Sequence, residues 1–352
     1  MAAQHLADRE RLGPALCGYN VIMAVVDPSE VAADAGLVYL VGDRPGITRR
    51  RHGRGVVYEG PRGGRIDAST RGWIESLAIP PAWGDVWISP DREAHLLAHG
   101  VDAAGRTQYR YHPEFRRAAD ATKFARMSKI ADRLPRLRAA TRIALRSADE
   151  RICIIGLVTH LIDCTLIRVG TERYAEENDS YGACTLLQRH VRIDAETVAF
   201  DFRSKGGLRR RFSVSDQLLA EQLSARRRPR PSSPILVTST GWTPSGADLA
   251  DFLSSATGID MTAKDLRTWG ATSTMVGALC APTQARDPLL AAYDVVAARL
   301  GNTRNVTRAS YVAPRIVDAW ESGELGQIWS TSRASARFSR AERAAAKALR
   351  QS

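Results

Sequence analysis

One side chain with a reactive atom stands out in this sequence, the tyrosine at position 311. It lies in RNVTRASYVAPRIVDAW (304–320), between basic and small residues and an apolar, helix-like segment. Its hydroxyl is either the polar end of a core aromatic or a reacting group. Its neighbours in sequence do not separate these alternatives.

The positive charge of the chain is of an unusual kind. Nearly all of it is arginine, and a guanidinium grips phosphate through a planar fork but does not release a proton near neutral pH, whereas a lysine ammonium can. A reaction that requires a basic residue to give up a proton therefore has few candidates. Lysine occurs only at positions 123, 129, 205, 264 and 347.

Two cationic side chains lie at positions that fit either an ordinary structural role or a catalytic role. Arg168 ends an apolar helical segment, where it could neutralise the helix dipole or pair with Asp163 or Glu172. Lys205 lies in a predicted turn, where it is either a solvated side chain or the one local cation able to act as an acid.

Arg267 is harder to explain by local stability. Thr262 and Asp265 have the spacing of a capping box, which places Arg267 in the first turns of a helix. A cation there opposes the helix dipole. Phosphate contact therefore explains this arginine better.

The segments that must position these residues are of two kinds, one β-rich and one mostly helical. Residues 37–115 predict a small β-rich domain, because short runs such as GVVYEG, DVWISP and TQYRYHP are broken by Gly, Pro and Asp. Residues 116–329 predict a mostly helical domain. Within it, HVRIDAETVAFDFRSKGGLRRRFSV (190–214) predicts strands joined by turns, one of them containing Gly206 and Gly207.

Several helices and both ends of the chain can also be placed. Helices are expected at 245–257, 262–280 and 287–300. Residues 1–36 are expected to be an N-terminal extension, and residues 330–352 a basic, alanine-rich, peripheral helical tail.

Composition narrows the class of protein. The chain has 352 residues, 44% of them hydrophobic, and a formal net charge of +12. This charge attracts polyanions, most commonly nucleic acid. The longest apolar run, ICIIGLVTHLI (152–162), is shorter than the roughly 18 residues a membrane span needs, and the start of the chain does not fit a signal peptide. We expect a cytoplasmic protein.

The cysteines give no metal or disulfide pattern. Their scattered positions match neither a disulfide framework nor a zinc spacing, so they are expected to be small buried side chains. They are Cys17, Cys153, Cys164, Cys184 and Cys280.

Long segments of this chain resemble the type IB DNA topoisomerases, most closely the short bacterial branch that is similar to the poxvirus enzymes. These segments contain, in this order, Arg168, Lys205, Arg267 and Tyr311. The resemblance covers about residues 36–322. It rests on LAIPPAWGDVWISP, GVDAAGRTQYRYHPEFR, LIRVGTERYAEENDSYGACTLLQRHV, TAKDLRTWGAT and ARLGNTRNVTRASYVAP.

The resemblance implies an α+β fold of two lobes. A small β-rich N-terminal domain and a mostly helical catalytic domain with a small antiparallel sheet would close on double-stranded DNA as a C-shaped clamp. The catalytic domain would have the fold shared by tyrosine recombinases and type IB topoisomerases. It also implies a nucleoid-associated monomer with no membrane partner and no small-molecule substrate.

The resemblance implies a role for each of the four residues. Tyr311 would attack a backbone phosphorus and form a 3′-phosphotyrosine, so that supercoils relax without ATP. Arg168 and Arg267 would stabilise charge on the phosphate oxygens in place of a metal, which would be at most stimulatory. Lys205 would protonate the departing 5′-oxygen.

Asn302 departs from the family pattern. Poxvirus and eukaryotic relatives carry a histidine nine residues before the tyrosine, and no histidine of this chain follows His190. The amide NH₂ of Asn302 can still donate to a phosphate oxygen, though without charge. We expect activity with slower cleavage.

For DNA contact, the resemblance indicates Gln108, Tyr109, Tyr111 and Tyr174. Alternation along a strand would send Tyr109 and Tyr111 to one face, which either contacts DNA or is a half-buried sheet face. The arginine runs at 49–54 and 226–230 either bind phosphate or are solvated surface.

Two other functions compete with this one. A tyrosine recombinase shares the Arg/Lys/Arg/Tyr set but usually carries a histidine near the second arginine, where this chain has Lys264 three residues before Arg267. A DNA-binding protein of the same fold without catalytic activity is the other alternative.

Overall fold

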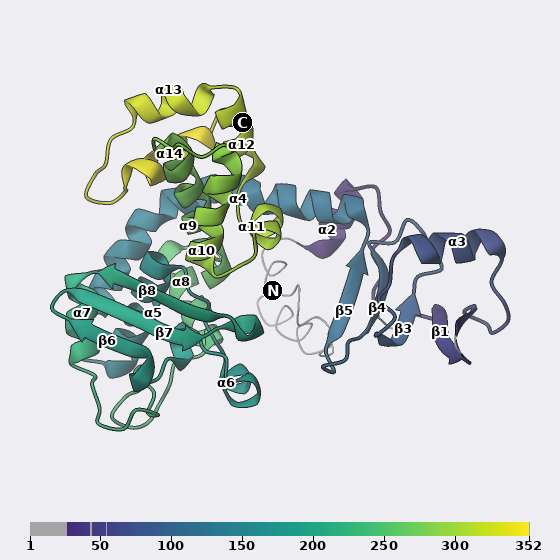
Figure 1. Cartoon of the computed structure of the whole chain (residues 1–352), viewed down its shortest axis with the longest axis horizontal. Helices are drawn as coiled ribbons and strands as arrows, with labels where there is room; N and C mark the ends of the chain where they lie inside the picture. Colours follow the sequence, from purple (N-terminus) through teal and green to yellow (C-terminus); the bar gives the residue numbers. More distant parts are fainter. Residues whose placement is uncertain (1–26, 43, 54, 352) are drawn as a thin grey trace. The chain divides into compact units, whose positions relative to one another are not determined.

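The computed structural model describes residues 27–42, 44–53 and 55–351. The chain divides into two compact units, Met1–Lys123 and Phe124–Ser352. The boundary falls within the long helix α4 (Pro113–Ala144; Figure 1). Most of the predicted N-terminal extension lies outside the described residues, and its last part forms α2 (Pro28–Asp34). The predicted clamp and domain boundaries stay predictions.

The first unit is built on an antiparallel sheet with strand order β2-β1-β3-β4-β5. The strands predicted from GVVYEG, DVWISP and TQYRYHP are confirmed as β2, β3 and β5. Ile74 of helix α3 is buried with Ile47, Val86, Ile88 and Ala98 of the sheet. The elements are β1 (Ile47–His52), β2 (Gly55–Glu59), α3 (Ala68–Ser76), β3 (Gly84–Ile88), β4 (Leu96–Val101) and β5 (Thr107–Tyr111).

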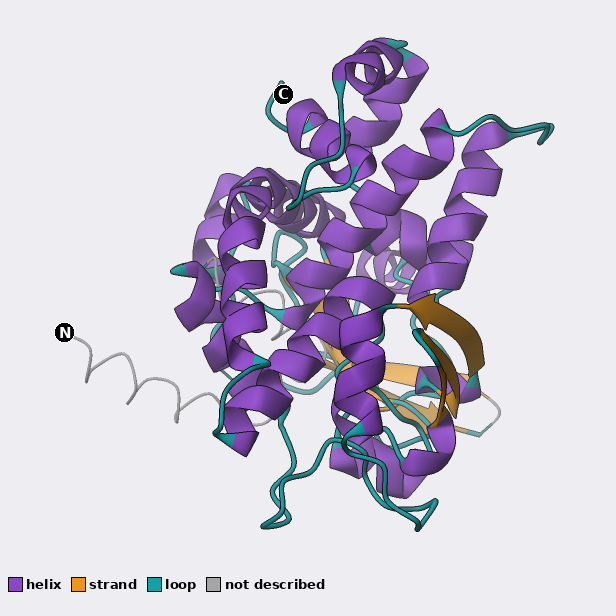
Figure 2. Ribbon diagram, turned by 90° about the vertical axis from the view of Figure 1, so that its left-hand side faces the viewer, coloured by secondary structure: helices purple, strands orange, loops and turns teal. Residues whose placement is uncertain are grey.

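The second unit is mostly helical, with a small antiparallel sheet of order β6-β7-β8 (Figure 2). Helix α5 has nine buried residues, and five of them belong to the main hydrophobic core, namely Ile154, Leu157, Val158, Leu161 and Ile162. The strands are β6 (Val191–Asp194), β7 (Thr197–Arg203) and β8 (Arg209–Ser215). The helices are α5 (Glu150–Thr165), α6 (Glu172–Asn178), α7 (Gln217–Ser224), α8 (Gly246–Thr257), α9 (Ala263–Cys280), α10 (Pro288–Leu300), α11 (Arg304–Ser310), α12 (Pro314–Glu321), α13 (Glu324–Thr331) and α14 (Arg340–Ala348).

The predicted helix starts are confirmed with their caps. Ser245 caps α8 and Thr262 caps α9, each in a reciprocal capping box, and Asp287 caps α10. The turn between β7 and β8 contains Gly206 and Gly207, as the sequence indicates. The overall α+β class and the small antiparallel sheet are also as expected.

The C-terminal tail is not peripheral, and this expectation was wrong. Helix α14 packs against α9 and α13, and its alanines are buried in the core. A Cβ built on Gly277 of α9 would lie 3.4 Å from the Cβ of Ala341. Small side chains on both helices therefore allow this close packing, which a count of basic residues does not predict.

Among the described helices, none combines the length and the apolar character needed to cross a bilayer.

Candidate active site

Tyr311 lies at the C-cap of α11, directly before α12. Its backbone N–H donates to the carbonyl of Thr307 at 3.0 Å. The hydroxyl of Thr272, on α9, donates to the Tyr311 carbonyl at 3.3 Å and accepts from the Ala313 N–H at 3.3 Å. The side chain is 8% exposed. The tyrosine is thus fixed by backbone contacts on both sides.

Arg267 holds the tyrosine hydroxyl. Its Nη1 donates to the Tyr311 hydroxyl at 3.0 Å, and its guanidinium carbon is 5.0 Å from the centre of the tyrosine ring. The other donors bind the carbonyls of Leu166 at 2.8 Å and Leu300 at 3.0 Å. These carbonyls belong to the C-terminal ends of α5 and α10, where the helix dipole favours a cation. Two helix ends therefore support this buried arginine.

Arg168 follows the end of α5 and reaches the segment after α10. Its Nη1 donates to the Gly301 carbonyl at 3.3 Å, and its Nη2 donates to Oδ1 of Asn302. Because a guanidinium only donates, the amide oxygen must face it, and the amide NH₂ faces away. That Nδ2 is buried without a hydrogen-bond partner among the described residues. Asn302 thus has a donor available for an acceptor from outside the chain.

Arg210 is a further site residue that the sequence interpretation missed. It is 8% exposed and donates to the Arg299 carbonyl at 2.8 Å. A Cβ built on Gly301 would lie 2.5 Å from Cδ of Arg210, and Gly301 has a φ of +63°. Both the close approach and the left-handed backbone require glycine at position 301.

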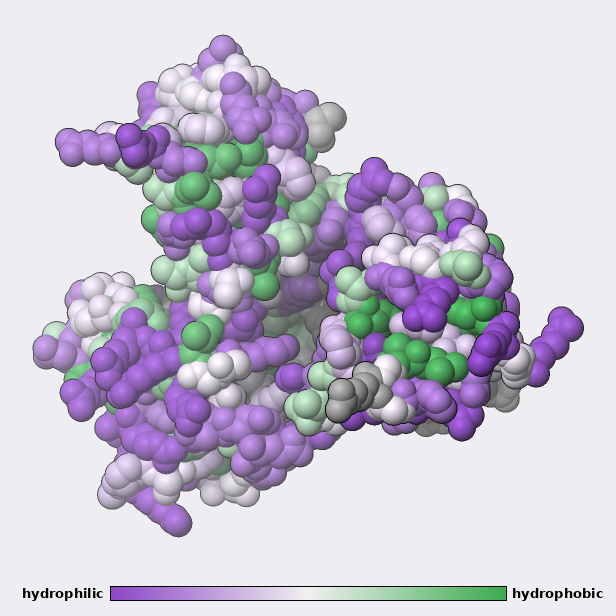
Figure 3. All heavy atoms as spheres, turned by 45° about the vertical axis from the view of Figure 1, so that its right-hand side comes forward, coloured by the Kyte–Doolittle hydropathy of each residue, from purple (hydrophilic) through white to green (hydrophobic). Residues whose placement is uncertain are grey.

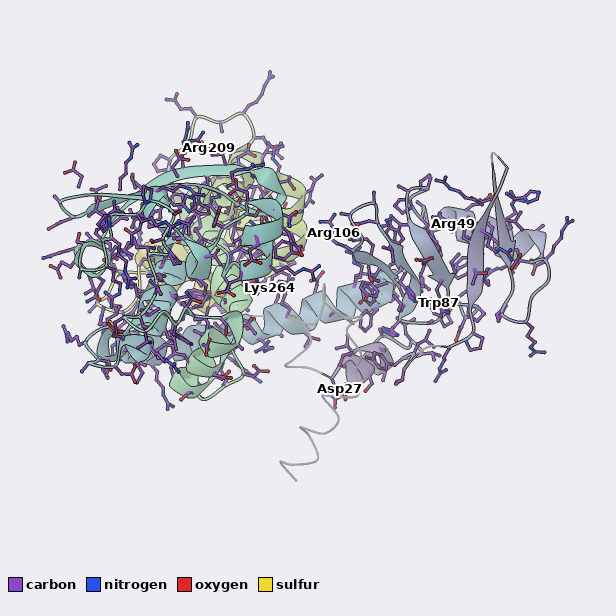
Figure 4. The ribbon with its side chains drawn as sticks, turned by 90° about the horizontal axis from the view of Figure 1, so that it is seen from below. Asp27, Arg49, Trp87, Arg106, Arg209 and Lys264 are labelled. Atoms are coloured by element: carbon purple, nitrogen blue, oxygen red, sulfur yellow. The ribbon has the colours of Figure 1, made fainter. Side chains whose placement is uncertain are left out.

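Strand alternation was the signal that could have identified Arg210. In LRRRF, Arg209 and Arg211 bind Asp201 on the exposed face of the sheet, at 2.7 and 3.1 Å. The residue between them must point to the other face. Arg209 is labelled in Figure 4.

A cationic cluster is formed by two buried arginines, Arg210 and Arg267, and by the half-buried Arg168. In the described part of the chain, none of Arg168, Arg210 and Arg267 makes an ion pair. Burial lowers the pKa of Arg168. Burial, and secondarily the charge of Arg168, lowers the pKa of Arg267 to about 10. Burial together with the charges of Arg267 and Arg168 lowers the pKa of Arg210 to about 10. An anion at this place would relieve both the desolvation and the repulsion.

Lys205 is not gathered with the other four predicted residues. It begins the exposed turn between β7 and β8, where Gly206 and Gly207 have φ values of +80° and +74°. Its ammonium makes no hydrogen bond with any residue that the structure describes. The turn continues into β8, which carries Arg210. Lys205 therefore belongs to the same hairpin as a buried site residue, but stands in solvent.

The predicted DNA-contact residues lie on two elements. On β5, Tyr109 and Tyr111 share a face as expected, with their ring centres 5.9 Å apart. Tyr111 also stacks on Phe115 at 5.6 Å. Gln108 donates to Asp102 at 3.0 Å. Tyr174 lies on α6 and is 40% exposed.

The arginine runs are largely occupied with structural contacts. Arg49, labelled in Figure 4, donates to the carbonyls of Ile79, Pro80 and Trp83. In the second run, Arg227 donates to the carbonyls of Gln188 and Val191. Neither run is simply solvated surface.

Comparison with known proteins places this site in a family. Residues 112–320 match the catalytic core of eukaryotic DNA topoisomerase I, and residues 55–102 match the N-terminal domain of bacterial DNA topoisomerase IB. DNA topoisomerase 1B of Acanthamoeba polyphaga mimivirus is 27% identical over 266 residues, which cover 71% of this chain and 79% of that protein. DNA topoisomerase 1 of Rabbit fibroma virus is 25% identical over 145 residues, which cover 40% of this chain and 45% of that protein.

A solved structure of the XerH site-specific recombinase, bound to its difH substrate in a pre-cleavage complex, gives a TM-score of 0.36 at 14% identity. The overlap covers 53% of this chain and 52% of the recombinase. The match to the topoisomerase catalytic core spans more than half of the chain and includes Arg168, Lys205, Arg267 and Tyr311. The chain therefore belongs to the type IB DNA topoisomerases.

Proposed function

We propose that this protein relaxes positively and negatively supercoiled DNA by cutting and resealing one strand through Tyr311. The observation that carries the proposal is the 3.0 Å hydrogen bond from Arg267 to the Tyr311 hydroxyl, within a cluster of cations that pairs with no carboxylate of the described residues. A phosphodiester supplies the anion that this cluster needs.

In the proposed cleavage step, the phenol of Tyr311 gives its proton to water as its oxygen bonds to the phosphorus. The bond from phosphorus to the 5′-oxygen breaks, and Lys205 gives that oxygen a proton. One phosphodiester is exchanged for another, so the strand can be resealed by the reverse step without ATP. Rotation of the cut strand before resealing removes supercoils.

The cations have separate tasks in this proposal. Arg168 and Arg267 bind the non-bridging oxygens, and Arg267 also stabilises negative charge on the tyrosine oxygen. Arg210 adds a third guanidinium charge behind them. Asn302 donates through its otherwise unpartnered NH₂. These groups provide the charge stabilisation that a metal supplies in other phosphoryl-transfer enzymes, so we propose that neither a metal nor ATP is required.

We further propose that the protein acts as a monomer on double-stranded DNA in the nucleoid. In this proposal, Gln108, Tyr109 and Tyr111 of the first unit and Tyr174 of the second contact the duplex near the cleavage site. The two units would close on DNA as a clamp. The net charge of +12 supports binding that weakens steeply with salt.

The test is relaxation of positively and negatively supercoiled plasmid in EDTA without ATP. We expect wild type to relax both and to form a covalent adduct with DNA, seen by denaturing electrophoresis after detergent trapping. Tyr311→Phe should do neither. Tyr293→Phe removes another buried tyrosine hydroxyl of the same unit and should behave as wild type. Relaxation by Tyr311→Phe, or a wild type without an adduct, would overturn the proposal.

A further inference from the structure

A group of metal-ligating side chains lies apart from the tyrosine and the arginines. His160, Cys164 and Asp216 place their ligand atoms within 4.8 Å of one another. His160 and Cys164 are one turn apart on α5 and so share a helix face. Asp216 comes from the residue between β8 and α7, far away in sequence. None of the three takes part in the proposed cleavage.

The carboxylate of Asp216 is already oriented for a second contact. As the N-cap of α7, it accepts the Leu219 N–H through Oδ1 at 2.9 Å. Its Oδ2 lies 2.7 Å from Nε2 of His160. One oxygen thus fixes the position of the side chain, while the other points at the remaining members of the group.

The surroundings leave room for an ion. All three residues are half-buried. His160 and Cys164 line a cavity of about 940 Å³ between α5, α9 and α10. A bound ion could therefore keep a water molecule as a further ligand.

The donor types select the metal. One imidazole nitrogen, one sulfur and one carboxylate oxygen suit zinc, which is commonly four-coordinate with three protein ligands and one water. Calcium and magnesium prefer all-oxygen sites. We propose that His160, Cys164 and Asp216 bind a divalent transition-metal ion of the zinc type.

A cation close to the cysteine favours its use as a ligand. Arg299 donates to the Cys164 carbonyl at 3.1 Å and so places a positive charge near this residue. Such a charge favours the thiolate, which is the form of cysteine that binds metal.

The position of the site indicates a structural role. Cys164 lies four residues before Arg168, and Asp216 lies six residues after Arg210. An ion bridging them would tie together the two segments that deliver these arginines to the cleavage site. It would stabilise the catalytic unit without contacting DNA.

The experiment uses the full-length protein titrated with Co²⁺, whose bond to a thiolate gives a near-ultraviolet charge-transfer band. We expect this band at saturation, one ion per chain by elemental analysis after dialysis, and a higher melting temperature with Zn²⁺. Cys164→Ser should lose the band. Cys280→Ser, which changes another half-buried cysteine outside the group, should keep it.

The variant Asp216→Asn serves as a second test that does not depend on whether Cys164→Ser folds. The asparagine amide oxygen can still cap α7, so the variant should fold. Because the variant lacks the charged ligand, it should bind Co²⁺ at least 10-fold more weakly than wild type, as expected when a site loses a ligand or its support. Wild type that retains no ion would overturn the proposal. So would an unchanged band in Cys164→Ser together with unchanged affinity in Asp216→Asn. These readouts do not depend on DNA cleavage.

Discussion

At the scale of single residues, the proposed cleavage site is a compromise between stability and function. Three guanidinium groups, two buried and one half-buried, lie together. Among the described residues, carbonyls and an amide support them rather than carboxylates. Folding lowers the affinity of Arg210 and Arg267 for their protons. The charged forms therefore destabilise the folded protein at all pH values below about 10. A phosphate in the site would remove this penalty.

Arg210→Met tests this compromise. Methionine keeps much of the apolar stem beside Gly301 but removes the charge and one hydrogen bond, worth about 1 kcal/mol. We expect the free energy of unfolding without DNA to stay the same or to rise, because like-charge repulsion is relieved. Single-turnover cleavage should fall by at least ~10-fold, since an electrostatic donor in such a site contributes about that much or more. Urea unfolding and rapid-quench cleavage measure the two effects.

The matched control is Arg211→Met, the next residue on the opposite face of β8. Its side chain is 66% exposed and pairs with Asp201, so removing it should leave cleavage nearly unchanged. Equal cleavage by wild type and Arg210→Met would remove Arg210 from the site. A large loss of stability in Arg210→Met would show that Arg210 stabilises the fold instead.

At the scale of elements, the sequence predicts those parts that local chemistry determines. The capping box of Thr262 and Asp265 places the start of α9, and with it Arg267 in the first turns. Short runs broken by Gly, Pro and Asp predict strands of the first sheet but not β1, whose sequence ITRRRH was interpreted only as an arginine run. The strands of the second sheet were predicted from residues 190–214. Helix α3 was missed because its window, ASTRGWIES, has few apolar residues, and only Ile74 in it is buried.

The sequence does not predict which elements far apart in the chain contact one another. Arg168 is supported by the segment after α10, which lies 133 residues further along the chain. The burial of Arg210 follows from contact between β8 and the end of α10. The alanine-rich tail enters the core because α9 offers small residues at that place. These contacts depend on tertiary packing, which composition and periodicity do not determine.

The hairpin of β7 and β8 carries the proposed acid on its exposed turn. Because Gly206 and Gly207 have positive φ values and lie in an exposed turn, we expect the turn to rearrange when DNA binds. Lys205→Ala should slow cleavage of ordinary DNA by about 100-fold or more, the usual contribution of a general acid. The defect should be much smaller on a substrate with a sulfur leaving group, which departs without a proton.

Single-turnover cleavage of both substrates measures this prediction. Lys129→Ala is the matched control, because Lys129 is an exposed lysine on α4. It should cleave both substrates at wild-type rates. If Lys205→Ala were equally slow on both substrates, Lys205 would act by binding phosphate rather than by donating a proton.

At the scale of the whole molecule, the charged side chains serve both the hydrophilic surface and contacts within the protein. Hydrophilic residues cover most of the face shown in Figure 3, where apolar residues form separate patches. Yet part of the net charge of +12 is engaged in hydrogen bonds with the protein's own backbone, as the contacts of Arg49 and Arg227 with carbonyls indicate. Charge count alone therefore overestimates the cations available to DNA.

Both units share a sensitivity to acid. His95 in the first unit and His190 in the second accept a backbone N–H at Nδ1, from Leu40 and Leu187, each at 3.1 Å. Burial lowers the pKa of each histidine to about 4. Protonation at Nδ1 would remove the acceptor. Each unit therefore keeps one neutral histidine as part of its fold.

The sign of the resulting pH dependence follows from proton binding. Between about pH 6.5 and pH 4, the unfolded histidines bind protons that the folded ones do not. Stability is therefore fully present above about pH 6.5 and is lost as the pH falls toward 4. At about 1.4 kcal/mol per pKa unit, each histidine contributes at most ~3 kcal/mol.

Glutamine variants test each unit separately, because glutamine can accept the same N–H but cannot become charged in this range. Urea unfolding at pH 7 and pH 5 should show that wild type loses stability on acidification. His95→Gln should reduce that loss in the transition of the first unit, and His190→Gln in that of the second. His52→Gln changes an exposed histidine of β1 and should retain the full loss. If both buried-site variants lost as much stability as wild type, other groups would govern the acid sensitivity.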